Sequence, residues 1–430
     1  MNKQILRLAI PNIISNLAVP LLGIVDTALV GRMEGLDHIG AVAIGGMIFN
    51  FVYWGFGFLR MGTTGLTAQS YGRTEKQEII HTLIRSIAVA LIAGLLIIFL
   101  QKLIAFVSFN LINASQSVEE SAHVYFNIRI YAAPATLTLY AFHGWFLGMQ
   151  NARYPLFLTI LTNLANIGFN LFFIKVHGMK SDGIALGTVF AQYFGLIFAI
   201  LLFLFSYRSY ITVINKQALL HLERLKQFLN LNSDIFIRTL LLIFAFSFFT
   251  AQSAKLGDDI LAANSILMQL WMVFSFGIDG FAFSAESIVG KYKGASDMQN
   301  LKKAIHYIFI WGVSLGAVFS IFFGFSDRWL LSLFTNKYFL INLSLVYMPW
   351  TIIAPLINSF CYLWDGIYIG ATASKAMRNA MLFSTLIVFL PVFYIGMYFW
   401  QNHGIWLALL VFMLTRWFSL HFLAKKYIFT

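Results

Sequence analysis

Long apolar stretches recur along almost the whole chain and limit the folds that it can adopt. Each is long enough to span a bilayer, which takes about 20 apolar residues in a helix. Hydrocarbon offers no hydrogen bonds to an exposed backbone, so long apolar stretches cross it as helices. We therefore predict an all-α integral membrane protein with twelve transmembrane helices, at 5–31, 39–70, 83–108, 120–150, 155–176, 183–206, 233–256, 260–290, 302–325, 343–370, 376–400 and 404–424.

The overall composition agrees with a membrane protein. Hydrophobic residues make up 60% of the chain and charged residues only 11%, whereas a soluble globular protein is roughly 25% charged. The first apolar run is too long for the core of a secretory signal, so we expect it to be the first transmembrane helix. The chain has a single cysteine, Cys361, which excludes an intrachain disulfide.

Lysine and arginine are distributed unevenly over the loops. The N-terminus, every second connection and the C-terminus hold 18 of them. The other loops hold seven, which are Arg32, Lys102, Lys175, Lys180, Lys255, Arg328 and Lys337. Because the richer side of a membrane protein faces the cytoplasm, both termini are predicted to be cytoplasmic. This bias accounts for the net charge of +12 without a nucleic-acid partner.

The two halves of the chain repeat at a constant offset. The pairs Ala133-Pro134 and Ala354-Pro355 lie 221 residues apart, as do Gly183-Ile184 and Gly404-Ile405. Each half holds six predicted spans, so both halves start on the same side and are parallel repeats. We expect two pseudo-symmetric six-helix lobes, residues 1–206 and 233–430, joined by a basic cytoplasmic linker at 207–232. A solute cavity between the two lobes is the default expectation for such a fold.

Four acidic side chains fall inside the predicted spans: Asp26, Asp279, Glu286 and Asp365. A carboxylate in hydrocarbon costs several kcal/mol, about 2.5–3.5 kcal/mol for Asp on insertion scales. Such a group carries a proton or an ion, binds a cationic solute, or is held by a basic partner. Together the four acids favour a transporter over a passive scaffold.

Asp26 shares one predicted helix face with Asn12, Asn16 and Gly23. That face is small and polar, so we expect it to point into the interior of a lobe and not into lipid. A carboxylate buried there is placed to take up a proton. The alternative is a structural ion pair with Arg60 of the second span.

The fifth predicted span carries Asn163, Asn166 and Asn170 on one helix face. An asparagine side chain both donates and accepts, so these residues could relay hydrogen bonds around Asp26 or hold a polar solute. The alternative is contact between helices, worth about 0.6 kcal/mol per hydrogen bond.

A second charged cluster is predicted in the second half. Asp279 and Glu286 share one helix face, seven residues apart, and Asp365 lies in a later span. Arg238, near the start of the seventh span, is the expected countercharge. Three acids around one arginine would leave negative charge for a cation or a proton. The alternative is a fully paired network that stabilises the lobe.

Several other classes of site find no support in the sequence. No histidine is spaced from a cysteine or another histidine like a pair of metal ligands, so we expect no metal or other cofactor beyond the coupling ion. A phosphate-binding loop of the GxxxxGK[ST] type is absent, which argues against ATP-driven transport by this chain alone. The HExxH motif of an intramembrane metalloprotease is absent too.

Four segments of the chain resemble a known transporter family: LLGIVDTALVGR, FLRMGTTGLTAQSYG, IDGFAFSAES and CYLWDGIYIGATASKAMRNAM. They are similar to the DinF-like branch of the multidrug and toxic compound extrusion (MATE) family, and the resemblance spans both halves. It implies twelve helices in two lobes, a central cavity and export of organic solutes coupled to a cation.

The resemblance also implies roles for particular residues. Asp26 matches the coupling aspartate on the first helix of better-known members, and Asn166 and Thr188 match positions on the fifth and sixth helices. Asn170 stands where those members have a second aspartate, so Asp26 is the only carboxylate of this cluster. Family members bend the first helix at a proline, for which Pro11 and Pro20 are candidates here.

These features lead to one functional hypothesis with two alternatives. We expect a monomeric antiporter of a bacterial inner membrane that exports cationic or amphipathic compounds in exchange for H⁺, or alternatively Na⁺. Its partners would be the solute and membrane lipid. One alternative is a flippase for lipid-linked or polysaccharide precursors, which would need a strongly cationic cavity. The other is an intramembrane enzyme, which would need a nucleophile and a base or a metal site.

The charge bias predicts which loops are accessible from outside the cell. After Cys361 is replaced, single cysteines at Lys102 and Lys337 should react with an impermeant thiol reagent in intact cells. Cysteines at Arg73 and Lys303 should react only after permeabilisation, because they lie on the arginine- and lysine-rich side. The reverse pattern would invert the orientation, and labelling of all four from one side would contradict the even number of spans in each half.

Overall fold

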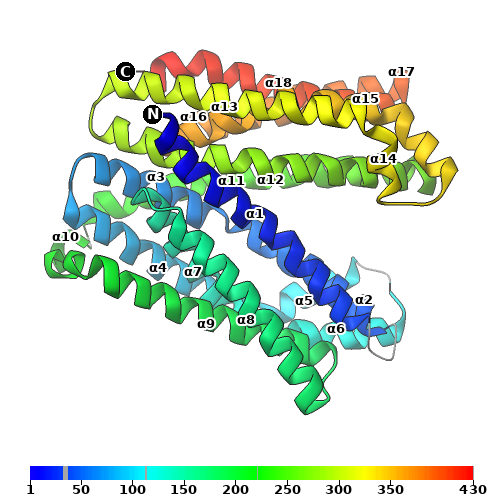
Figure 1. The fold of residues 1–430 in the computed structure, drawn as a ribbon, viewed down its shortest axis with the longest axis horizontal. Coiled ribbons are helices and arrows are strands. Elements are labelled where there is room, and N and C mark those ends of the chain that lie inside the picture. Colours follow the sequence, from blue (N-terminus) through cyan, green and yellow to red (C-terminus); the bar gives the residue numbers. More distant parts are fainter. Residues whose placement is uncertain (32–36, 112–113, 220, 430) are drawn as a thin grey trace. The chain divides into compact units, whose positions relative to one another are not determined.

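The computed structural model describes residues 1–31, 37–111, 114–219 and 221–429, and every regular element in these ranges is helical. Arg32, counted above among the loop cations, lies outside the described residues. Figure 1 shows the helices in chain order. The first half contains α1 (Asn2–Val30), α2 (Asp37–Gly55), α3 (Phe58–Gly72), α4 (Lys76–Phe99), α5 (Gln101–Asn110), α6 (Gln116–Arg129), the short 3₁₀ helix η1 (Ile130–Ala132), α7 (Ala133–Gly148), α8 (Arg153–His177) and α9 (Ser181–Tyr207).

A short connection and a second set of helices follow. The connection contains η2 (Arg208–Val213) and α10 (Lys216–Leu219). The second half contains α11 (Leu222–Lys255), α12 (Asp258–Gly294), α13 (Met298–Phe325), α14 (Asp327–Ser332), α15 (Tyr338–Gly370), α16 (Ser374–Leu382), the π-helical turn η3 (Phe383–Phe389), α17 (Leu390–Trp400) and α18 (Asn402–Tyr427).

The helices confirm the all-α membrane fold. Within the described residues, ten helical segments are long and apolar enough to cross a membrane. The other two predicted spans correspond to α1 and to the consecutive segments α6, η1 and α7. The predicted span 83–108 was misplaced, because α4 begins at Lys76 and the helix is interrupted at Leu100 before α5. The linker is also shorter than predicted, because α11 already begins at Leu222.

The chain divides into two compact units. One contains Ile14–Gln227, and the other contains Phe228–Thr430 together with Met1–Ile13. The first thirteen residues thus group with the second half, unlike in the predicted division at residues 206 and 233. Gly280 of α12 explains this grouping, because a side chain there would lie 2.3 Å from Ile13 Cγ1 and 2.9 Å from the Ala9 carbonyl oxygen. The start of α1 therefore packs directly on α12.

The turns at equivalent places in the two halves have the same backbone. Thr74 and Ser296 both have a left-handed φ, of 59° and 55°, and both follow a long helix. Gln150 and Thr372 form a second such pair, with φ of 63° and 54°. The hydrogen bonds match as well, since Glu75 N donates to Ser70 O and Asp297 N donates to Tyr292 O. These shared turns are what two copies of one repeat would have.

Both halves have a hydroxyl that bonds to a proline carbonyl one turn earlier. Thr138 donates its hydroxyl to Pro134 O at 2.7 Å in the first half, and Ser359 donates to Pro355 O at 2.7 Å in the second. These pairs lie at the predicted offset of 221, whereas the turns are 222 residues apart (296 − 74), as are Gly144 and Gly366 (366 − 144), which lie against the carbonyls of Arg60 and Ala282. The chain around Pro134 is broken into α6, η1 and α7, whereas α15 continues through Pro355.

Close packing of α12 on α15 positions one of the predicted acids. Gly366 follows Asp365 directly, and a side chain at Gly366 would lie 2.3 Å from the carbonyl oxygen of Ala282 on α12. A glycine at this position therefore lets the two backbones touch, as small residues do in membrane helix pairs. The approach brings Asp365 into the interior of the second unit, where it is only 4% exposed.

Alanine at Gly366 should separate α12 from α15 and destabilise the protein. Overpacking of a core costs about 1–3 kcal/mol, so Gly366→Ala should lower the melting temperature in detergent. Gly324→Ala is the matched control on α13, because its added carbon would meet only Ile352 Cγ2 at 3.8 Å. That control should be neutral or stabilising, since alanine favours helix over glycine by about 1 kcal/mol. Equal melting temperatures for the two variants would contradict the close contact.

Candidate functional site

Asp26 of α1 is held by a chain of side chains from α8 and α9. Asn170 donates its amide to Asp26 Oδ1 at 2.8 Å and to Asn166 Oδ1 at 2.9 Å. Asn166 in turn donates to Thr188 Oγ1 at 3.0 Å, and Thr188 donates to the carbonyl of Ile184 at 2.9 Å. The predicted residues Asn166, Asn170 and Thr188 are thus brought together with Asp26. An amide in this chain orients the carboxylate, because it donates without giving up a proton.

A glycine makes room for this chain. A side chain at Gly187 of α9 would lie 2.1 Å from Asn170 Oδ1. The absence of a side chain there lets Asn170 lie fully buried between α8 and α9 and reach Asp26. The sequence alone did not single out Gly187, because nothing in it shows that this glycine faces Asn170.

Asn163 has a different role from the other two asparagines of α8. Its amide donates to the backbone carbonyl of Ala18 on α1 at 3.0 Å. One turn earlier on α8, the Thr159 hydroxyl pairs with Ser15 of α1 at 2.8 Å. Both predicted arrangements of the asparagine face therefore occur, with Asn166 and Asn170 hydrogen-bonded around Asp26 and Asn163 in contact between α1 and α8.

Asp26 lines a cavity of about 430 Å³ in the first unit. Arg129 at the end of α6 lines the same cavity, together with Trp54, Phe51 and Met47 of α2. The cavity thus combines one acid, one base and an apolar wall. Arg129 is the residue of this site that the sequence analysis missed, although it was visible as a cation inside the fourth predicted span.

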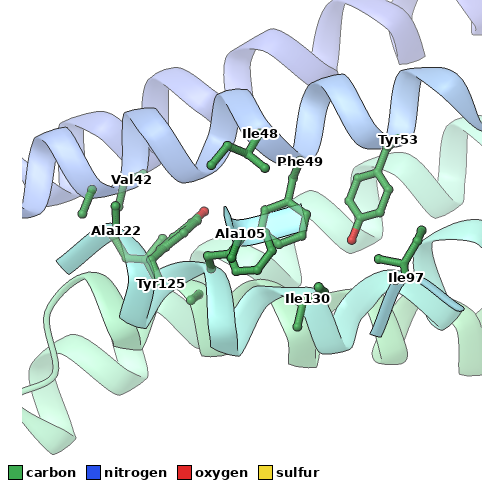
Figure 2. Packing of buried hydrophobic residues seen from close by; sticks show 14 of the residues in the cluster. Val42, Ile48, Phe49, Tyr53, Ile97, Ala105, Ala122, Tyr125 and Ile130 are labelled. Carbon is green, nitrogen blue, oxygen red and sulfur yellow. The ribbon is translucent and has the colours of Figure 1, made fainter. Parts of the chain in front are cut away.

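Aromatic side chains hold Arg129 in place. The Tyr125 hydroxyl accepts a hydrogen bond from Arg129 Nη1 at 2.5 Å, and the guanidinium lies 5.1 Å from the centre of the Phe49 ring. Such contacts between a cation and an aromatic ring stabilise a desolvated charge by about 2 kcal/mol or more. Figure 2 shows Phe49 of α2 and Tyr125 of α6 within the packed cluster of this unit. Arg129 is therefore held by side chains of α2 and α6.

Among the residues that the structure describes, Arg129 and not Arg60 lines the cavity of Asp26. The predicted alternative paired these two side chains, but the cavity around Asp26 is lined by Arg129. Arg60 lies on α3, where its carbonyl accepts the Thr64 hydroxyl at 2.8 Å and touches the position of Gly144 on α7. The helix that brings an arginine to this cavity is α6 and not α3. The spacing of residues along the chain does not show which helix lies beside Asp26.

The second unit contains a buried ion cluster centred on Asp365. Arg238 of α11 and Arg416 of α18 both donate to Asp365 Oδ2. Arg238 is the predicted partner, and Arg416 is an additional one. The ion pairs that the structure describes thus place two arginines on one acid, whereas the prediction had three acids around one arginine. These three residues, Arg238, Asp365 and Arg416, form the ion cluster of the second unit.

The other two predicted acids of this half lie on α12. Glu286 is buried, and its backbone carbonyl lies against Gly370 of α15. Asp279 is close enough to Tyr362 of α15 for an electrostatic interaction. A separate ion pair joins Asp234 of α11 to Arg378 of α16 at 2.5 Å. The α12 acids are thus in the same unit as Asp365, but the ion pairs described for Asp365 come from α11 and α18.

Comparison with known proteins gives the chain its relatives. The MatE family profile matches the chain twice, at residues 11–172 and 235–395, as expected for two repeats. DNA damage-inducible protein F of Escherichia coli is 35% identical over 97% of this chain and 91% of its own length. A probable multidrug resistance protein NorM of Bacillus anthracis is 22% identical over 95% of this chain and 92% of its own length.

Solved structures share the fold. A MOP superfamily transporter from Pyrococcus furiosus superposes with a TM-score of 0.87 at 18% identity, covering 99% of this chain and 95% of that one. A multidrug resistance MATE family transporter in an outward-facing conformation has a TM-score of 0.86, 18% identity and the same coverage.

The ion cluster predicts an order of stabilities. Asp365→Asn should be the most destabilising change, because it removes the carboxylate that both buried arginines bind, and breaking a buried pair costs about 3–5 kcal/mol. Arg416→Ala should be milder, since Arg238 and Asp365 still form a neutral pair. Melting temperatures in detergent test this order, and Arg416→Ala should partly rescue Asp365→Asn. Additive effects, or a milder Asp365→Asn, would contradict a shared network.

Proposed function

Because the chain belongs to the MatE family, whose members are membrane transporters and not enzymes, we propose that it is a secondary active exporter of organic compounds. It would exchange its solute for H⁺ by alternating access, without a cofactor. The observation that carries this proposal is Asp26, the acid of the first unit that combines a hydrogen-bonded carboxylate with a solute-sized cavity of about 430 Å³.

The groups around Asp26 favour H⁺ over Na⁺ as the coupling ion. The Asn170 amide donates to the carboxylate, and the Arg129 guanidinium, a donor too, lines the same cavity. A hard metal cation needs several oxygen ligands around it, whereas these neighbours offer N–H groups and a positive charge. A proton needs only the carboxylate itself.

The cavity walls favour an amphipathic solute. Phe51 and Trp54 offer apolar and aromatic surface, while Asp26 and Arg129 offer one charge of each sign. A cationic group of the solute would compete with the proton for Asp26, which couples the two movements. The relatives named as multidrug resistance proteins agree with a broad choice of solutes. No finding supports the flippase alternative.

The remaining parts of the proposal concern the setting of the protein. We place it in a bacterial inner membrane with both termini in the cytoplasm, acting as a monomer surrounded by lipid. The Escherichia coli relative supports a bacterial membrane. The direction of export follows from the charge bias of the loops and depends on the labelling experiment described above.

Asp26→Asn should abolish dye efflux driven by a pH gradient in proteoliposomes while leaving the melting temperature nearly unchanged. The amide cannot take up a proton at the coupling position, so a proton gradient can no longer drive solute exchange. Glu120→Gln, which changes an exposed acid of α6, is the matched control and should transport normally. Wild-type efflux should be the same with and without Na⁺. A pH-dependent efflux that survives in Asp26→Asn would contradict the role of Asp26.

A further inference from the structure

Polar residues recur every seventh position along α15. They are Ser344, Thr351, Asn358 and Asp365, and their side chains are 0%, 0%, 0% and 4% exposed. Seven residues are nearly two helical turns, with a drift of only about 20° per seven residues, so these side chains lie along one face. At ~1.5 Å per residue, the file of these four residues is ~31 Å long. That length matches the ~30 Å hydrocarbon core of a bilayer.

The side chains of the file have polar atoms without protein partners. Among the described residues, no hydrogen-bond partner lies near Ser344 Oγ, Thr351 Oγ1 or either amide atom of Asn358. A buried polar atom without a partner costs about 1–3 kcal/mol, and buried polar groups without a protein partner are ordinarily satisfied by bound water. Unsatisfied atoms at successive steps of one file indicate a common ligand.

Proline adds backbone acceptors beside the file. Pro349 and Pro355 lie inside α15. A proline cannot donate to the carbonyl four residues earlier, which for Pro355 is the carbonyl of Thr351. The file therefore offers main-chain oxygens as well as side chains near its middle.

The Asp365 end of the file has a free hydrogen-bond acceptor. Asp365 Oδ2 accepts both arginines, while Oδ1 is buried without a partner among the described atoms. Arg238 Nε also lacks a partner there. The cluster thus offers one free acceptor and one free donor to a small polar ligand.

We propose that the α15 file binds a chain of water molecules that leads from Ser344 to Asp365 Oδ1. Successive side chains of the file are ~10 Å apart along the helix, a distance that two or three waters at hydrogen-bond spacing span. The waters would hydrogen-bond the unpartnered atoms of Ser344, Thr351 and Asn358 and would join them to the ion cluster through Asp365 Oδ1.

Radiolytic hydroxyl-radical labelling tests for the water itself. Radicals formed from a bound water modify reactive side chains beside it. Met348 lies one turn from both Ser344 and Thr351, and Cys361 lies one turn from both Asn358 and Asp365; both reporters are at most 1% exposed. In the purified protein we expect both to be labelled well above Trp145, an equally buried residue of the first repeat. Labelling of Met348 and Cys361 no higher than that of Trp145 would overturn the proposal.

Three variants separate a water chain from simple packing. Thr351→Val removes one hydroxyl with little change of shape, and Asn358→Leu replaces the amide by an apolar side chain of similar size. Both should reduce the labelling of Met348 and Cys361 to the level of Trp145. Ser359→Ala is the matched control, because this equally buried hydroxyl already donates to Pro355 O, and it should leave labelling unchanged. Should Asn358→Leu fail to fold, Thr351→Val decides alone; unchanged labelling there would contradict the chain.

Discussion

Hydrocarbon cannot satisfy a hydrogen bond, and the rest of this structure depends on that constraint. It places the backbone in helices, because a helix satisfies its own amides and carbonyls. It also forces each polar side chain inside the bundle to find a partner or to have a reason for lacking one. Asp26 finds a partner in Asn170, and Asp365 finds two in Arg238 and Arg416. The polar side chains of the α15 file have atoms without protein partners, for which we propose bound water.

The two repeats keep one scaffold and use it for different chemistry. Their turns share left-handed residues at equivalent places, and Thr138 and Ser359 make the same bond to a proline carbonyl. The polar residues differ between them, since His143 occupies the position equivalent to Asp365. One half therefore has a cavity lined by an acid, and the other has a buried ion cluster. The close contacts at Gly144 and Gly366 are common to both halves, so the helix packing is the same where the polar residues differ.

The candidate site was predictable where a single helix carries the information. The asparagine face of α8 follows from helical spacing, and Asp26 stood out because a carboxylate in an apolar run is rare. Arg129, Arg416 and Gly187 were not predictable as members of their sites. Their contacts join helices that are far apart in sequence, and spacing along one helix says nothing about which face a distant helix presents.

The sequence by itself determined the membrane fold, the repeat and the acids that lie within apolar segments. Length, hydropathy and helical periodicity are properties of a single segment, and they decide whether that segment can span a bilayer. Only the tertiary structure decided that Arg129 shares the cavity of Asp26, that two arginines meet one acid at Asp365, and that residues 1–13 pack with the second half. These outcomes depend on how closely the helices approach one another. Residues at the helix interfaces set that distance, as Gly366 does by having no side chain against α12.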